Sequence, residues 1–265
     1  MRLFPLVAAL GTFAGLSVTL SPVARASNSV NNAGGTVNGH TWTTTDANGD
    51  GLPEAVQVDG VWYTNITPGS QFTTPQGVTI CVGTPGPDTI DESPPNGVGT
   101  PCLIFGGGGN DTLTGTDQDD AIYGGGGDDT VNGGNGNDDV RGQDGNDSVN
   151  GGAGNDKCSG GEGNDGVNGG DGNDEAHGGN GNDSVNGGNG NDSVFGDGGD
   201  DTIDGSGGGT DYYSGGDGAD SFTGTDGQGD DTYSYGSDDG APDSGDADSS
   251  GDTVSAGPGD TTNWK

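Results

Sequence analysis

From Gly106 onward the chain repeats every nine residues, and this period constrains the fold more than any other feature. Each unit has the template G-G-x-G-x-D-x-U-x, numbered here as positions 1 to 9, in which U is apolar. The register holds through eleven units in 106–204, survives one inserted residue in 205–214, and continues through 215–223. So short and regular a period is typical of a solenoid, in which each unit packs only on its neighbours.

Composition excludes most other folds for this array. Of the 265 residues 63 are Gly and only 25% are hydrophobic, too few for a conventional core. The formal net charge of −37 argues against binding to nucleic acid or to anionic membrane surfaces, which would repel the chain. A disordered acidic tail is the alternative interpretation, but disorder does not require Gly and Val to recur in phase.

The three residues that end each unit are expected to form a short strand, whose alternation directs U inward and its neighbours outward. The predicted inward residues are Leu113, Ile122, Val131, Val140, Val149, Cys158, Val167, Ala176, Val185, Val194, Ile203, Tyr213 and Phe222. Position 9 is uniform in alternate units, as Thr114, Asn132, Asn150, Asn168, Asn186 and Asp204, and varied in the others, as Tyr123, Arg141, Ser159, His177, Phe195 and Ser214. This split predicts an all-β fold, a parallel β-roll with two faces in which residues 18 apart stack.

Stacking would align the position-6 aspartates in two columns at the two edges of the roll. The first column would contain Asp111, Asp129, Asp147, Asp165, Asp183 and Asp201, and the second Asp120, Asp138, Asp156, Asp174 and Asp192. Carboxylates spaced about 4.8 Å apart repel strongly. A hard divalent cation between successive turns would remove the repulsion, since it takes six to eight oxygen ligands.

The template resembles the repeats-in-toxin (RTX, hemolysin-type) calcium-binding nonapeptide. The resemblance implies several Ca²⁺ ions between turns, held by the Asp side chains of both columns with Asp220, and by backbone oxygens of the glycine-rich turns. The expected glycine ligands are Gly107, Gly109, Gly125, Gly127, Gly134, Gly136, Gly152, Gly154, Gly161, Gly163, Gly170, Gly172, Gly179, Gly181, Gly188 and Gly190. Because the apolar side chains are too few to offset the backbone entropy, we expect the array to be disordered without calcium.

The array is expected to extend at both ends. Residues 83–91 match the template, and 97–105 are in phase with Ile104 at the apolar position but Cys102 where Asp belongs. Residues 83–105 are therefore predicted to be degenerate capping repeats before the roll of 106–223. Residues 224–265 lose the register and are predicted to be an acidic degenerate repeat or tail.

The N-terminus has the pattern of a secretory signal peptide over residues 1–26. A basic start precedes an apolar run, and Ala24-Arg25-Ala26 supplies small residues for cleavage after Ala26. We expect a secreted, extracellular protein with no membrane span after cleavage. An uncleaved anchor is the alternative.

Residues 27–82 are predicted to form a small, β-hairpin-rich region. Strand-like runs occupy His40–Thr45, Ala55–Val58, Val61–Ile66 and Gly77–Val82. Between the first two runs, the sequence resembles the D-x-N-x-D-G loops of EF-hand-like and integrin-type repeats. That resemblance implies a second calcium site made by Asp46, Asn48, Asp50, the carbonyl of Leu52 and Glu54. A hairpin turn without metal is the alternative.

The three cysteines are expected to be structural. Cys81 and Cys102 flank a Pro/Gly-rich loop that a disulfide between them would staple. Cys158 replaces Val at an apolar position and is predicted to be a buried thiol.

No catalytic signature is present, so we expect that the chain is not an enzyme. The sequence has no H-E-x-x-H and no G-x-S-x-G, and its two histidines, His40 and His177, are expected on strand surfaces. The predicted function is that of a secreted calcium-binding β-roll with a structural or surface-associated role, whose partners would be cell-surface or matrix components. The alternative is an adhesion module that binds glycan or ice with the uniform polar face.

Overall fold

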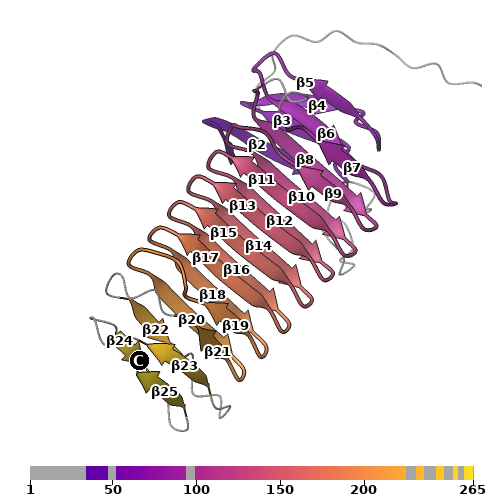
Figure 1. Cartoon of the computed structure of the whole chain (residues 1–265). Coiled ribbons are helices and arrows are strands. Elements are labelled where there is room, and N and C mark those ends of the chain that lie inside the picture. Colours follow the sequence, from indigo (N-terminus) through magenta and orange to yellow (C-terminus); the bar gives the residue numbers. More distant parts are fainter. Residues whose placement is uncertain are drawn as a thin grey trace, which may run out of the picture.

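The computed structural model describes residues 34–46, 52–93, 99–224, 231–235, 243–247, 253–255 and 260–264, and all of their regular structure is β-strand. Two long sheets run the length of the molecule, and a small sheet lies at the N-terminal end (Figure 1). This confirms the predicted all-β, parallel β-roll. None of the described residues forms a helix that could span a membrane.

The small sheet is an antiparallel meander, as the hairpin-rich composition of residues 27–82 predicts. Its strands, in spatial order, are β1 (Gly34–Val37), β2 (His40–Thr45), β3 (Ala55–Val58) and β4 (Val61–Thr64). The expected strands His40–Thr45 and Ala55–Val58 are confirmed at both ends. The two other expected strands are shorter than predicted, since β4 stops at Thr64 and β6 begins at Thr79.

The first long sheet has eleven strands and contains every second strand of the roll. In chain order they are β5 (Gln71–Thr73), β6 (Thr79–Val82), β8 (Cys102–Gly108), β10 (Ala121–Gly126), β12 (Asp139–Asp144), β14 (Lys157–Glu162), β16 (Glu175–Asn180), β18 (Ser193–Gly198), β20 (Tyr212–Asp217), β22 (Thr232–Ser234) and β24 (Thr253–Ser255). All neighbours are parallel except β5, which is antiparallel to β6.

The second long sheet has ten parallel strands and contains the intervening ones. They are β7 (Thr89–Asp91), β9 (Thr112–Thr114), β11 (Thr130–Asn135), β13 (Ser148–Ala153), β15 (Gly166–Asp171), β17 (Ser184–Asn189), β19 (Thr202–Asp204), β21 (Ser221–Thr223), β23 (Ser244–Ala247) and β25 (Thr261–Trp264). Because β22 to β25 continue both sheets, the register lost in the sequence beyond residue 223 is kept in the structure.

One turn of the roll takes 18 residues, as predicted. Val131 lies opposite Val149, and Val140 opposite Cys158. All thirteen predicted inward side chains are buried and join one hydrophobic cluster that runs between the two sheets. The core is therefore a single column, to which each unit contributes one apolar side chain.

The first strands of the roll are also buried on their outer face. Trp42 of β2 packs edge-on against Phe105 and Tyr123, with ring centroids 6.0 and 5.5 Å apart. Tyr123 is at the outward position 9, where the repeat predicts exposure, and yet it is only 4% exposed. The small sheet therefore covers the start of the eleven-stranded sheet and makes a second core there.

The cysteines lie in the core as free thiols. Cys81 on β6 lies opposite Ile104, two residues beyond Cys102 on β8, so the register does not bring the two cysteines directly opposite each other. The stapling disulfide considered from the sequence is not formed. Cys158 is a buried thiol as predicted, and burial raises the pKa of its sulfhydryl above the usual range.

Candidate metal sites along the aspartate columns

The position-6 aspartates form two columns in which each residue binds the next. The backbone N–H of Asp129 donates to Oδ1 of Asp147 at 2.8 Å, and the N–H of Asp147 donates to Oδ1 of Asp165 at 2.7 Å. The same bond joins Asp138 to Asp156 in the other column. The predicted stacking is confirmed. Each of these carboxylates uses Oδ1 to accept a hydrogen bond from the backbone N–H of the aspartate one turn earlier.

Both columns extend beyond the regular units of residues 106–223. The first begins with the N–H of Asp88, which donates to Asp111, and continues through Asp220 and Asp243 to Asp260. The second begins at Cys102, whose N–H donates to Oδ1 of Asp120 at 2.6 Å. The predicted capping repeats thus keep the backbone N–H to Oδ1 hydrogen bonds of the columns. Cys102 takes the position of an aspartate and donates its N–H, but it has no carboxylate.

The second oxygen of most column aspartates is buried and receives no hydrogen bond from the described residues. This holds for Oδ2 of Asp111, Asp129, Asp138, Asp147, Asp156, Asp165, Asp174, Asp183, Asp192 and Asp201. A buried carboxylate oxygen without a donor is costly, and in these columns the cost recurs at every turn. The observation indicates that a cation or a proton must satisfy these atoms.

Position 1 of the template supplies a second oxygen next to most of these atoms. An added Cβ at Gly151 would lie 2.6 Å from Oδ2 of Asp156 and 2.5 Å from the carbonyl oxygen of Gly169, one turn further along. The carboxylate oxygen and the carbonyl oxygen therefore face the same small space, which only glycine leaves open. Position-1 carbonyls were not among the predicted ligands, because the template alone does not tell which turn carbonyls face the aspartate.

The predicted glycines of positions 2 and 4 all have positive φ, for example +118° at Gly125 and +120° at Gly127. In this conformation the carbonyl of one glycine points along the roll toward the equivalent glycine of the next turn. Added Cβ atoms at Gly125 and Gly127 would accordingly collide with the carbonyl oxygens of Gly107 and Gly109. These carbonyls line the gap between turns, where the predicted ions would lie.

Asp120 differs from the other predicted ligands. Its Oδ2 accepts the backbone N–H of Thr116 at 2.6 Å and the Thr116 hydroxyl at 3.0 Å. Thr84 satisfies Asp88 in the same way, with its hydroxyl 2.9 Å from Oδ2. Threonine at position 2 therefore replaces the need for a cation at the N-terminal end of both columns.

Burial raises the pKa of the column carboxyls, although the backbone N–H that each accepts opposes the rise. The pKa of Asp138 is raised to about 9. The pKa values of the others are raised to about 7 for Asp129, Asp147 and Asp201, and to about 6 for Asp111, Asp120, Asp156, Asp165, Asp174 and Asp192. Desolvation is the main cause in each case, and repulsion by neighbouring carboxylates adds to it at many of them.

These sites would need backbone oxygens. Within the described ranges no three His, Cys, Asp or Glu side chains gather as a metal-binding group. The donor set that is present, a carboxylate oxygen with turn carbonyls, consists of the hard oxygen ligands that Ca²⁺ prefers. The residues therefore fit calcium held between successive turns.

The second predicted calcium loop is only partly described. Asp46 and Leu52 are buried, with Leu52 packed into the core beneath the small sheet, and the Glu54 N–H donates to the Thr45 carbonyl at 3.0 Å. Asn48 and Asp50 lie outside the described residues, so this site stays a prediction.

Taken together, the single-column core and the stacked carboxylates define a cation-binding β-roll. The RTX calcium-binding nonapeptide repeat matches the chain in four overlapping copies, over residues 105–140, 132–167, 168–203 and 177–210. Residues 105–210 thus match RTX calcium-binding repeats, and they form a β-roll whose oxygen donors fit calcium. No curated protein matches the chain.

Proposed function

We propose that this chain is a secreted protein whose calcium-dependent β-roll has a structural, surface-associated role and performs no catalysis. The observation that carries the proposal is the series of buried Oδ2 atoms that no described donor satisfies. Calcium, when bound, would supply the positive charge between these carboxylates. The chain's own residues do the rest: the aspartates link successive turns, and the glycines let backbone oxygens approach the gap.

Secretion gives this chemistry a suitable setting. The signal-like residues 1–26 lie outside the described residues, and their role rests on the sequence pattern. Extracellular modules bind calcium with dissociation constants of about 10⁻⁴ to 10⁻³ M, so an exported chain can fold where calcium is abundant. We propose cell-surface or matrix components as its partners.

A ligand-binding role of the uniform face is less well supported. The Asn side chains of β11, β13 and β15 bond to one another, with Nδ2 of Asn150 and of Asn168 each 2.8 Å from the preceding Oδ1. These bonds occupy groups that glycan or ice would need.

The proposal is tested by calcium titration of the chain from Ser27 to Lys265. We expect calorimetry to report several ions per chain at millimolar calcium or below, and far-UV circular dichroism to gain its β-signal over the same range. Magnesium is the control, because it requires a tighter octahedral site. A β-signal that is unchanged in calcium-free buffer would contradict the proposal.

A further inference from the structure

The varied face of the roll, formed by the eleven-stranded sheet, carries a cluster of cationic side chains. Arg141 on β12 and Lys157 on β14 are the only Arg and Lys among the described residues, and His177 lies on the next strand, β16. The uniform face of the other sheet has small polar side chains at the equivalent positions. Since both faces enclose the same core, the roll itself does not require this difference.

Each cation of the cluster is already paired with an acid. Arg141 Nε lies 2.7 Å from Oδ1 of Asp139, and Lys157 Nζ lies 3.0 Å from Oε2 of Glu175. Glu175 also contacts His177 at 3.6 Å. The cluster is therefore close to neutral in a strongly acidic chain.

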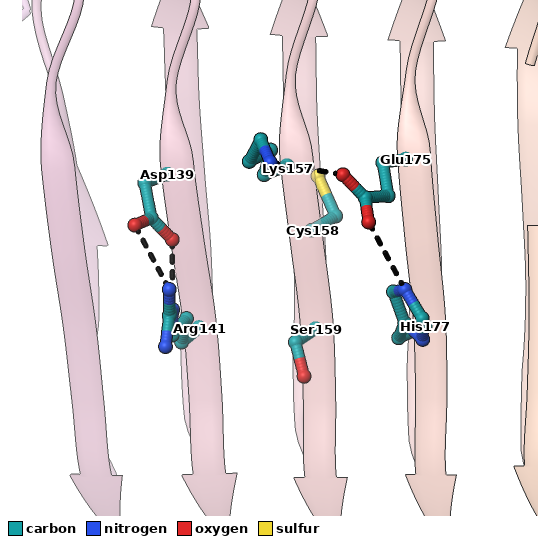
Figure 2. A pocket seen from close by; sticks show the side chains of 7 residues that line it. All are labelled: Asp139, Arg141, Lys157, Cys158, Ser159, Glu175 and His177. Atoms are coloured by element: carbon teal, nitrogen blue, oxygen red, sulfur yellow. Dashed lines mark hydrogen bonds and ion pairs between the residues drawn. The ribbon is translucent and has the colours of Figure 1, made fainter. Parts of the chain in front are cut away.

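A hollow of about 250 Å³ lies within the cluster (Figure 2). Ser159 lies opposite Arg141 on one side and opposite His177 on the other, in the register of three neighbouring strands. Its small side chain leaves a gap between two long ones, with Lys157 and Glu175 at one end (Figure 2). The gap is lined by both donors and acceptors.

An aromatic shelf continues from the hollow. The His177 ring is stacked on Phe195 of β18, with centroids 4.4 Å apart and planes at 10°. Phe195 in turn contacts Tyr212 of β20, with centroids 5.7 Å apart, and Tyr212 is 39% exposed. The hollow and the shelf together extend across five strands of one face.

A strained residue holds the junction between hollow and shelf. Asp197 occupies position 2, where most units have glycine, and its φ is +74°. Its Oδ2 lies 2.8 Å from Nδ1 of His177 and fixes that ring against Phe195. Non-glycine residues in this region of φ and ψ cost free energy and cluster at functional sites.

We propose that the hollow around Ser159 and the adjoining aromatic shelf bind a neutral oligosaccharide. Sugar rings present apolar C–H faces that pack on aromatic rings, and their hydroxyls both donate and accept hydrogen bonds. The paired carboxylate, ammonium and guanidinium groups can bond to such hydroxyls without losing their charge partners. An anionic chain is disfavoured, because the acidic roll repels it. The inference rests on the proposed function only in requiring the folded, calcium-bound roll.

The test measures binding of neutral hexasaccharides to the calcium-loaded chain by calorimetry. The probes are cellohexaose, maltohexaose and fully N-acetylated chitohexaose, with hexagalacturonate as the anionic counterpart. Ser159→Phe fills the hollow and Phe195→Ala removes the shelf. Ser148→Phe, the same change on the uniform face, is the matched control. Circular dichroism in calcium reports separately whether each protein forms the roll, so a failure of calcium-dependent folding is distinguished from a failure of this inference.

We expect at least one neutral probe to bind at millimolar concentration or below. Ser159→Phe and Phe195→Ala should each weaken that binding at least tenfold, and Ser148→Phe should leave it unchanged. If Phe195→Ala does not fold, Ser159→Phe decides. The proposal is overturned if no neutral probe binds, if only hexagalacturonate binds, or if Ser159→Phe binds as well as the parent chain.

Discussion

The backbone N–H of Asp147 donates to Oδ1 of Asp165 at 2.7 Å, while Oδ2 of Asp165 is buried and receives no hydrogen bond from any described residue. One carboxylate therefore has two roles. Oδ1 links consecutive turns with a bond that the chain makes by itself, and Oδ2 leaves a charge that the chain does not compensate. The separation of these roles explains how the same residue can both build the roll and make it depend on a cation.

The first prediction compares two aspartates of the columns. Asp165→Asn keeps an acceptor at Oδ1 but removes the uncompensated charge, so the calcium concentration at the folding midpoint should rise about tenfold, which corresponds to about 1.4 kcal/mol. In Asp120→Asn the new amide would face the Thr116 N–H, which should destabilise the first turns by about 1–3 kcal/mol even at saturating calcium. Calcium titrations followed by circular dichroism, and urea unfolding in calcium, separate the two effects. Equal calcium midpoints for both variants would contradict the assignment.

The second prediction compares two glycines that both lack positive φ. A Cβ at Gly151 would lie 2.5 Å from the Gly169 carbonyl oxygen, whereas one at Gly166 would meet nothing closer than 3.9 Å. Gly151→Ala should therefore lower the free energy of unfolding in calcium by about 2 kcal/mol or more. Gly166→Ala should leave it unchanged or raise it by up to about 1 kcal/mol, because it restricts the unfolded chain. Urea denaturation of both variants is the measurement. A Gly151→Ala variant as stable as the parent chain would argue against the close approach of Asp156 Oδ2 and the Gly169 carbonyl oxygen to Gly151.

The third prediction concerns pH. Burial raises the pKa of Asp165 to about 6 and of Asp147 to about 7, from an ordinary value of 3.8. The metal-free roll then binds more protons than the unfolded chain, so this stabilisation is complete below about pH 3.8 and is lost as the pH rises through 6 to 7. In calcium-free buffer, acidification from pH 7.5 to pH 4 should increase the β-signal.

With calcium present the same protons compete with the metal, and the calcium midpoint should rise as the pH falls. A metal-free chain that loses β-structure on acidification would show that the carboxyl pKa values are not raised in the roll.

The fourth prediction compares two tryptophans. Trp42 is 2% exposed and packs against Phe105 and Tyr123, whereas Trp62 is 48% exposed. Trp42→Ala should destabilise the N-terminal end by about 3–5 kcal/mol, and Trp62→Ala should have little effect. Hydrogen exchange in calcium should show the loss of protection in β8 and β10 for Trp42→Ala only. Uniform loss along the whole roll would mean that the small sheet supports more than its neighbours.

Much of the fold follows from the period of the sequence. A template with one apolar residue per nine has a single arrangement that buries them all, which is why Val131 and Val149 could be placed opposite each other in advance. Ile104 and Cys102 were predictable for the same reason, because the phase of the repeat reaches them. Once residues 18 apart are stacked, the position-6 aspartates of alternate units must form two columns.

Features that depend on three-dimensional neighbours were not predictable. Tyr123 is buried by a sheet about eighty residues earlier in the chain, and no local pattern reports that contact. Thr116 stands where most units have glycine, and the template alone does not show that its hydroxyl bonds to Asp120. His177 was expected to be a solvated surface residue, but Phe195 and Asp197 hold it, and they lie one turn away.

The small sheet that contains Trp42 covers only the N-terminal end of the roll, which makes the two ends of the roll different. The end of the roll held by aromatic packing, and by threonines in place of ions, is the end that synthesis completes first. If later turns add their strands to this edge, the chain would avoid the costly step of starting a parallel sheet without a template. Folding would then proceed from the N-terminal turns toward the C-terminus. The calcium concentration would determine only how many turns of the roll are formed.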